Sequence, residues 1–449
     1  MIAAGELESE RSGMERATGG GGASDKEAES ATNEEAEPFA EDGRCPNDNN
    51  RAAAGSALPL AATIAVMAAT GEDNEEDVEE GESGALNRGR FVGRCQLWKT
   101  SLMKLFECGQ CRQLIFFENT ICESCGSALG FVVEEMRLAA LKQVGQDWRP
   151  VKGRAGQWRF CDNREHGTCN WMVPADDPNP LCRACRLNRT IPDLSDPENL
   201  DLWRRTEAAK HRLIYTLLRL GLPLKSKAED PETGFAFDFL APDPQEGAAM
   251  TGHAAGLITI NLEEADPAQR ERMRQDLSEP YRTMVGHFRH EIGHYYWADL
   301  VDGTGWLEPY RALFGDERAD YGEALNRHYE NGPPADWPNH FISAYATAHP
   351  WEDFAESWAH YLHIVDTLET AQTFGMTIRA RAGTDPILAM EIEFDPYRTA
   401  DFDGLVEAWV PLTAAVNSLN ASMGQPDLYP FVLANDVIEK LRFIHRLGR

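Results

Sequence analysis

His287-Phe-Arg-His-Glu-Ile-Gly-His-Tyr-Tyr-Trp297 is the stretch on which the interpretation of this chain depends. It places His290 and His294 four residues apart, with Glu291 directly after the first histidine. Positions four apart on a helix share one face and lie one turn apart. Two imidazoles so placed can bind one Zn²⁺. Glu291 would then lie beside the metal, where a general base for a zinc-activated water is needed.

The residues around this motif indicate a buried helix rather than a surface helix that carries the three side chains by chance. Val285, Phe288, Ile292 and the aromatic run Tyr295–Trp297 make the segment apolar on most sides, which is typical of a buried helix. Glycine inside a helix costs about 1 kcal/mol relative to alanine. We therefore expect another element to approach closely at Gly293.

A second helix is predicted in the segment Ala348–His363, and it is the best source of a third metal ligand. Pro350 suits the first turn of a helix. Glu352 and Glu356 are one turn apart and share a stripe of that helix. A catalytic zinc ion usually has three protein ligands and one open position. One of these carboxylates would complete a site of two histidines and one glutamate.

The pairing of the two histidines with Glu-Asp-Phe-Ala-Glu at 352–356 resembles the gluzincin type of zincin metallopeptidase. The stretches 314–321, 343–346 and 349–356 are more closely similar to a bacterial family of zinc-binding metallopeptidases with a zinc ribbon ahead of the peptidase domain. The resemblance covers roughly residues 103–449. It implies zinc ligands His290, His294 and Glu352 and a general base at Glu291, with Glu356 as the alternative third ligand.

The predicted fold class is α+β and mostly helical, with a zincin-like metallopeptidase domain at 191–449. Apolar periodicity predicts a helix at 198–220. Helices are also predicted at 268–277, a charged segment that follows Asp266 and Pro267, and at 403–418 and 434–446. Another opens at Ser278–Pro280 and includes the histidine motif. Strands are predicted at 235–240 and 255–262. By analogy with zincins, Leu257–Leu262 is the candidate edge strand for binding an extended peptide. An interior position of this strand is the alternative.

A zinc-ribbon region is predicted at residues 103–190. Two Cys-x-x-Cys turns offer four thiolates, which close a tetrahedral structural zinc site: Cys108, Cys111, Cys122 and Cys125. A ribbon of this size would be unfolded without metal.

A second structural zinc is predicted in the same region, at Cys161, Cys169, Cys182 and Cys185. His166 could replace Cys169 as a ligand. The segments 170–174 and 178–180 are loop-like. Zinc ribbons often bind nucleic acid, but the arginines here are scattered and the chain has a net charge of −30. We therefore expect a docking or substrate-presenting role, without nucleic acid.

Residues 1–102 are acidic and rich in glycine and alanine, so we expect them to be disordered. They lack a basic start typical of a secretory signal. Ala52–Thr70 has no charge but consists mostly of alanine, and we do not expect it to span a membrane. Met103 is an alternative start of translation. Eight of the ten cysteines fall in metal-like groups, which indicates a reducing compartment, the cytoplasm.

Other polar residues near the predicted site have weaker patterns. Asp316, Glu317 or Asp320 could accept a hydrogen bond from a ligand histidine, or they could belong to a solvated loop. Tyr321 and Tyr345 are candidates for stabilising the oxyanion of a tetrahedral intermediate.

The sequence thus predicts zinc-dependent hydrolysis of peptide bonds, with one catalytic and two structural zinc ions and a peptide or protein as substrate. Two alternatives remain. One is a zinc-binding protein-interaction module on a peptidase fold without catalysis. The other is a zinc-ribbon adaptor for nucleic acid.

Overall fold

The computed structural model describes residues 104–242, 251–276, 282–381 and 388–448. The predictions for residues 1–102, for the Ala52–Thr70 segment, for Met103 and for the helix start at Ser278–Pro280 lie outside these residues. Within the described part, no helix has the length and apolar character needed to cross a membrane.

The zinc-ribbon region, residues 104–190, contains two small antiparallel sheets and ends in a strand of a third sheet, described below. In the first, β1 (Leu105–Glu107) pairs with β2 (Leu114–Phe116). The second has five strands in sequence order, which are β3 (Leu129–Val132), β4 (Arg137–Val144), β5 (Asp147–Pro150), β6 (Trp158–Phe160) and β7 (Met172–Pro174). The prediction that 170–174 is a loop was wrong for its last three residues, because β7 pairs with β6 and places Met172 opposite Phe160.

A four-stranded sheet follows, in the order β10-β11-β9-β8. Its strands are β8 (Asn188–Thr190), β9 (Ala236–Leu240), β10 (Gly252–Ala254) and β11 (Leu257–Asn261). β8, β9 and β11 are parallel, and β10 is antiparallel to β11. The prediction that Leu257–Leu262 forms the edge was therefore wrong. β11 has a strand on each side, and among the described residues β10 and β8 are the two edge strands of this sheet.

Helices make up most of the remaining structure, as the predicted α+β class requires. They are α2 (Pro197–Leu220), α3 (Pro267–Asp276), α4 (Met284–Leu300), α5 (Leu307–Phe314), α6 (Tyr321–Asn331), α7 (Pro350–Thr373), α8 (Phe402–Ser422) and α9 (Asn435–Leu447). β12 (Ile378–Arg379) and β13 (Ala389–Met390) pair as a small antiparallel sheet. Short 3₁₀ helices lie at 133–135, 162–164, 185–187, 262–265, 337–339 and 345–347.

The two helices that carry the predicted ligands begin at clear capping residues. α4 starts at Met284, because the Thr283 hydroxyl accepts a hydrogen bond from the amide of Gly286 at 3.0 Å. α7 starts at Pro350, as predicted, and the His349 ring accepts a hydrogen bond from the amide of Trp351 at 3.1 Å.

α4 and α7 cross at Gly293, where the sequence predicted a close approach. A Cβ atom at Gly293 would lie 3.1 Å from Cα of Ala355 and 3.3 Å from Cβ of Trp358. Glycine thus allows the two ligand-bearing helices to pack with their backbones almost in contact.

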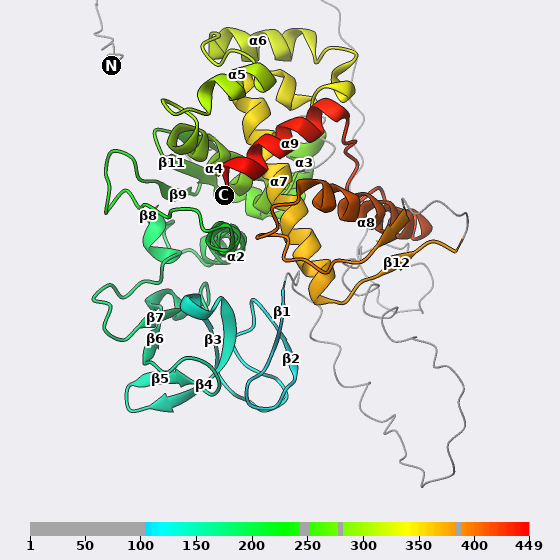
Figure 1. Cartoon of the computed structure of the whole chain (residues 1–449). Coiled ribbons are helices and arrows are strands. Elements are labelled where there is room, and N and C mark those ends of the chain that lie inside the picture. The colour runs from blue at the N-terminus through cyan, green and yellow to red at the C-terminus, as the bar shows by residue number, and fades with distance from the viewer. Residues whose placement is uncertain (1–103, 243–250, 277–281, 382–387, 449) are drawn as a thin grey trace, which may run out of the picture. The chain divides into compact units, whose positions relative to one another are not determined.

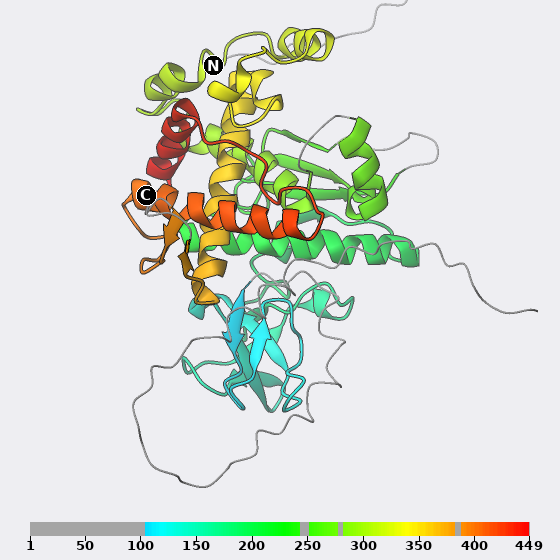
Figure 2. The same ribbon diagram turned by 90° about the vertical axis from the view of Figure 1, so that its right-hand side faces the viewer.

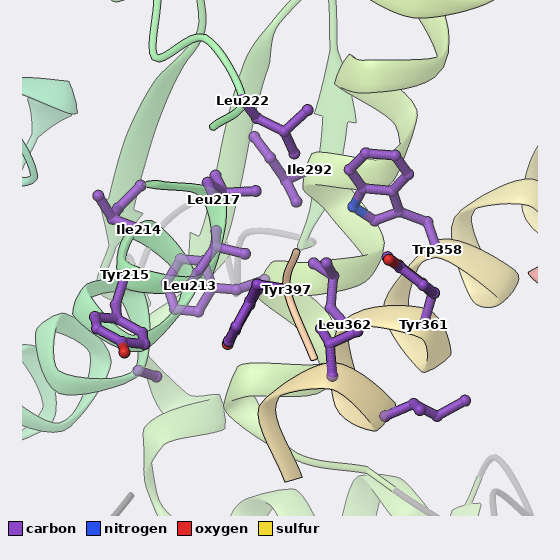
Figure 3. Packing of buried hydrophobic residues seen from close by; sticks show 14 of the residues in the cluster. Leu213, Ile214, Tyr215, Leu217, Leu222, Ile292, Trp358, Tyr361, Leu362 and Tyr397 are labelled. Atoms are coloured by element: carbon purple, nitrogen blue, oxygen red, sulfur yellow. The ribbon is translucent and has the colours of Figure 1, made fainter. Parts of the chain in front are cut away.

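Helix α2 connects the zinc-ribbon region to the rest of the fold. In two views it runs between the ribbon strands and the sheet of β8–β11 (Figure 1 and Figure 2). On one side, the Tyr215 ring lies 5.4 Å from the Phe117 ring of the ribbon. On the other side, Leu213 and Leu217 are fully buried in the same cluster as Ile292 of α4 (Figure 3). The position of α2 therefore affects both regions.

Candidate metal centres

Three predicted ligands converge between α4 and α7. Nε2 of His290 lies 3.0 Å from one carboxylate oxygen of Glu352, and Nε2 of His294 lies 3.5 Å from the other. One ligand atom from each residue falls within 4.8 Å of the others. Two imidazole nitrogens and a buried carboxylate form a donor set that suits Zn²⁺. The residues present therefore fit a single metal ion.

Glu356, the alternative third ligand, lies on the outer side of His290. Its Oε1 accepts a hydrogen bond from Nδ1 of His290 at 2.7 Å, and its Oε2 accepts one from the Ser343 hydroxyl at 2.6 Å. A carboxylate in this position fixes the ring of a metal-binding histidine and leaves the opposite nitrogen for the ion. The geometry thus favours Glu352 over Glu356 as the ligand.

The electrostatics of this centre suit a cation. Burial alone would lower the pKa of His290, but its hydrogen bonds to Glu352 and Glu356 raise that pKa well above its ordinary value. Burial would raise the pKa of Glu352, but hydrogen bonds to His290 and His294 hold it well below its ordinary value. The Glu352 carboxylate is therefore ionised, and a metal ion must compete with a proton at His290.

Glu291 projects from α4 beside these ligands and is half-buried. Within the described part of the chain, it forms no hydrogen bond or ion pair. Its carboxylate is thus not committed to a structural role. It can accept a proton from a water molecule at the metal.

Aromatic side chains surround the centre, and sequence reasoning missed two of them. The Trp351 ring lies 4.8 Å from the His294 ring. The His253 ring, on edge strand β10, stacks at 6.0 Å from the same histidine. Trp351 lies within the stretch 349–356 that carries the family resemblance, whereas His253 belongs to no motif and has no spacing to mark it. His253 brings the edge strand next to the metal ligands.

The two tyrosines predicted as oxyanion stabilisers both lie at the centre. The Tyr321 hydroxyl donates to Glu352 at 2.8 Å. The Tyr345 ring lies 5.9 Å from the His290 ring. Burial raises the pKa of both tyrosines, so both hydroxyls keep their protons and can donate hydrogen bonds.

The acidic loop before α6 does not support the ligand histidines. Asp316 and Glu317 form ion pairs with Arg318 and Arg311, and Asp320 caps α6. The prediction that one of these three carboxylates orients a ligand histidine was wrong, because nearby partners already engage them. Glu356 takes that position instead.

The first cysteine cluster lies in the turns that follow β1 and β2. The Sγ atoms of Cys108 and Cys125 are 3.8 Å apart, and those of Cys111 and Cys122 are 3.7 Å apart. Zn–S bonds of about 2.3 Å in a tetrahedron place sulfurs roughly 3.8 Å apart. The four residues therefore fit a closed zinc site. Cys111 and Cys125 are exposed.

The second cluster is buried in the fold. Cys161, Cys169, Cys182 and Cys185 bring their Sγ atoms within 4.8 Å of one another, and all four are buried. This donor set also fits a structural zinc ion. His166 does not join it, since its ring contacts Glu165 at 3.3 Å. The alternative in which His166 replaces Cys169 therefore disagrees with the structure.

These features define a zinc-ribbon region joined to a domain of the zinc metallopeptidase class. Residues 199–447 match a family described as putative zinc-binding metallo-peptidase, and residues 105–196 match a zinc-ribbon domain. The first match covers more than half of the chain, and the chain belongs to that family.

Relatives occur in mycobacteria. Uncharacterized proteins of Mycobacterium bovis and Mycobacterium tuberculosis are 42% identical to this chain over 344 residues, which cover 76% of this chain and 94% of each relative. No solved structure matches this chain.

Proposed function

We propose that this chain hydrolyses peptide bonds with one zinc ion held by His290, His294 and Glu352. The convergence of two Nε2 atoms and a buried carboxylate on one point, with an uncommitted carboxylate next to them, carries the proposal. When bound, Zn²⁺ acts as a Lewis acid that activates water and polarises a carbonyl group. Two further zinc ions, one in each cysteine cluster, would be structural.

Glu291 is the general base in this proposal. It accepts a proton from the attacking water and delivers it to the nitrogen of the leaving amine. Glu356 has a different role, because its bond to Nδ1 holds the His290 ring in a fixed orientation. Tyr345, whose ring lies beside His290, is the candidate to donate a hydrogen bond to the reacting carbonyl, because the hydroxyl of Tyr321 already donates to Glu352.

An extended peptide is the substrate that suits the sheet. Among the described residues β10 is an edge strand, so its outer backbone groups can pair with an added strand. His253 of β10 stacks on His294. A peptide paired with β10 would thus run past the metal ligands, which favours chains that can adopt an extended conformation.

The test is metal content and cleavage of a quenched-fluorescent peptide library by the full chain, with Glu291→Gln and His294→Ala as variants. We expect about three zinc ions in the parent and in Glu291→Gln, and about two in His294→Ala. Cleavage should fall by roughly 10²–10⁴ in Glu291→Gln, the usual contribution of a general base.

Two outcomes would overturn the proposal. If Glu291→Gln cleaved peptides at the parent rate, Glu291 would not be the general base. A parent with three zinc ions that retains peptides without cleaving any of them would favour the binding-module alternative.

A further inference from the structure

The second cysteine cluster contacts a histidine outside the zinc-ribbon region. Nε2 of His211, on helix α2, lies 3.4 Å from Sγ of Cys169 and 3.8 Å from Sγ of Cys185. His211 belongs to the segment that matches the peptidase family, whereas the cysteines belong to the ribbon match. The metal centre thus lies where the two matched regions meet.

The orientation of His211 is fixed by its own helix. Nδ1 of His211 donates to the backbone carbonyl of Glu207, one turn earlier, at 2.7 Å. Metal-site histidines are commonly held this way, with one ring nitrogen bonded to a carbonyl and the other directed at the centre. The Trp171 ring packs at 5.2 Å against the imidazole and restricts it further.

Helix α2 also supplies a buried ion pair next to His211. Lys210 is completely buried, and its Nζ lies 2.9 Å from Oε1 of Glu207 and hydrogen bonds with Asn188, just after Cys185. Four thiolates around one divalent ion leave a net negative charge, which is costly away from water. Because Glu207 neutralises Lys210, this pair brings no net charge to the centre, and the link between α2 and the cluster rests on His211.

We propose that the second cysteine cluster is an interdomain metal clamp, in which Nε2 of His211 lies against the cysteine sulfurs and ties metal occupancy of the ribbon to the position of α2. The first cluster lacks this arrangement. Among the described residues, its metal-binding group consists of ribbon cysteines alone, two of them exposed.

The clamp has a physical route to the candidate catalytic centre. One turn and a half beyond His211, the Thr216 hydroxyl donates to Asp366 of α7 at 2.7 Å. Leu217 of α2 is buried in the same cluster as Ile292, which lies within the histidine motif of α4. A shift of α2 would therefore disturb both helices that carry the ligands of the peptidase centre.

The first experiment measures zinc release from the full chain into excess chelator for the parent, His211→Ala and the control His166→Ala. Removing such a supporting partner typically weakens metal binding 10–100-fold. We expect one zinc ion to leave His211→Ala about 10-fold faster or more, and His166→Ala to behave like the parent. Equal release from His211→Ala and the parent would overturn the clamp.

A second measurement covers the case in which His211→Ala does not fold. Hydrogen exchange is compared in Cys182→Ser, at the clamp, and Cys122→Ser, at the first cluster. The clamp requires that amides of α2 lose protection in Cys182→Ser and keep it in Cys122→Ser. If amides lost protection only in the zinc-ribbon region in both variants, the proposal would be overturned. Neither experiment measures hydrolysis, so the outcome is independent of the proposed peptidase activity.

Discussion

Glu352 and Glu356 lie one turn apart on α7, and their hydrogen bonds separate their roles. Glu352 faces Nε2 of both histidines, whereas Glu356 faces Nδ1 of His290. We expect Glu352→Ala to lose the zinc ion of the peptidase centre. Glu356→Ala should keep that ion at saturating zinc with an affinity roughly 10–100-fold lower, because the ring of His290 loses its support.

Metal content by mass spectrometry and competition with a chelator would check this pair of variants. Glu330→Ala is a suitable control, since Glu330 is an exposed glutamate on nearby α6. If Glu352→Ala retained its zinc and Glu356→Ala lost it, Glu356 would be the metal ligand and Glu352 would not.

At the scale of single residues, the sequence predicted the site residues whose relative positions are fixed by one helix. His290, Glu291 and His294 occupy a single turn of α4, so their spacing determines their relative positions. It could not predict that Asp316 would pair with Arg318. That choice depends on the conformation of a loop, for which spacing carries no such information.

At the scale of elements, the crossing of α4 and α7 determines the distance between the ligands. Gly293→Ala should favour the helix by about 1 kcal/mol through propensity alone. However, the added Cβ would lie 3.1 Å from the backbone Cα of Ala355, which no side-chain rotation can move. We expect the helices to separate by a few tenths of an ångström, with weaker zinc binding at the peptidase centre.

Zinc affinity and thermal unfolding of the variant would check this prediction. Gly305→Ala is a matched control, because a Cβ at Gly305 has no atom within 4 Å. Zinc binding in Gly293→Ala as tight as in the parent would contradict the role given to this contact.

Long helices were predictable and the edge strand was not. α2, α8 and α9 each repeat an apolar face over several turns. The observed bounds of α2 and α9 lie within one residue of the predicted ones, whereas α8 ends at Ser422, beyond the predicted end at Ser418. β10 has only three residues, Gly-His-Ala, which show no alternation of apolar and polar side chains. Its place at the edge follows from pairing with β11, a contact that no local pattern encodes.

At the scale of the whole molecule, contacts between distant segments complete each centre. His211 reaches the second cluster from α2, and Ser343 supports Glu356 from the segment before α7. The sequence predicted the cysteine clusters, because their spacing is typical of zinc sites. It could not predict His211, which is 26 residues from Cys185 and has no motif of its own.

The C-terminal helix is anchored beside the peptidase centre by a buried ion pair. Nζ of Lys440, on α9, lies 2.6 Å from Asp353 and donates to the carbonyl of His340 at 2.7 Å. Removing one partner of a buried pair typically costs about 3–5 kcal/mol. Lys440→Met should lower the free energy of unfolding by this amount, and the double variant with Asp353→Asn should recover part of the loss.

The loss of folding stability in Lys440→Met should also depend on pH. Burial raises the pKa of Asp353 from 3.8 to about 7, although Lys440 acts in the opposite direction. A folded pKa above the unfolded one means that the contribution of Asp353 to stability is present below about pH 4 and is lost as the pH rises through 7.

Without Lys440, the ionised carboxylate of Asp353 has no cation to offset its burial. Lys440→Met should therefore cost more at pH 8 than at pH 5 in urea unfolding, whereas the double variant should show a smaller difference. An equal cost at both pH values would mean that Asp353 keeps one protonation state throughout this range.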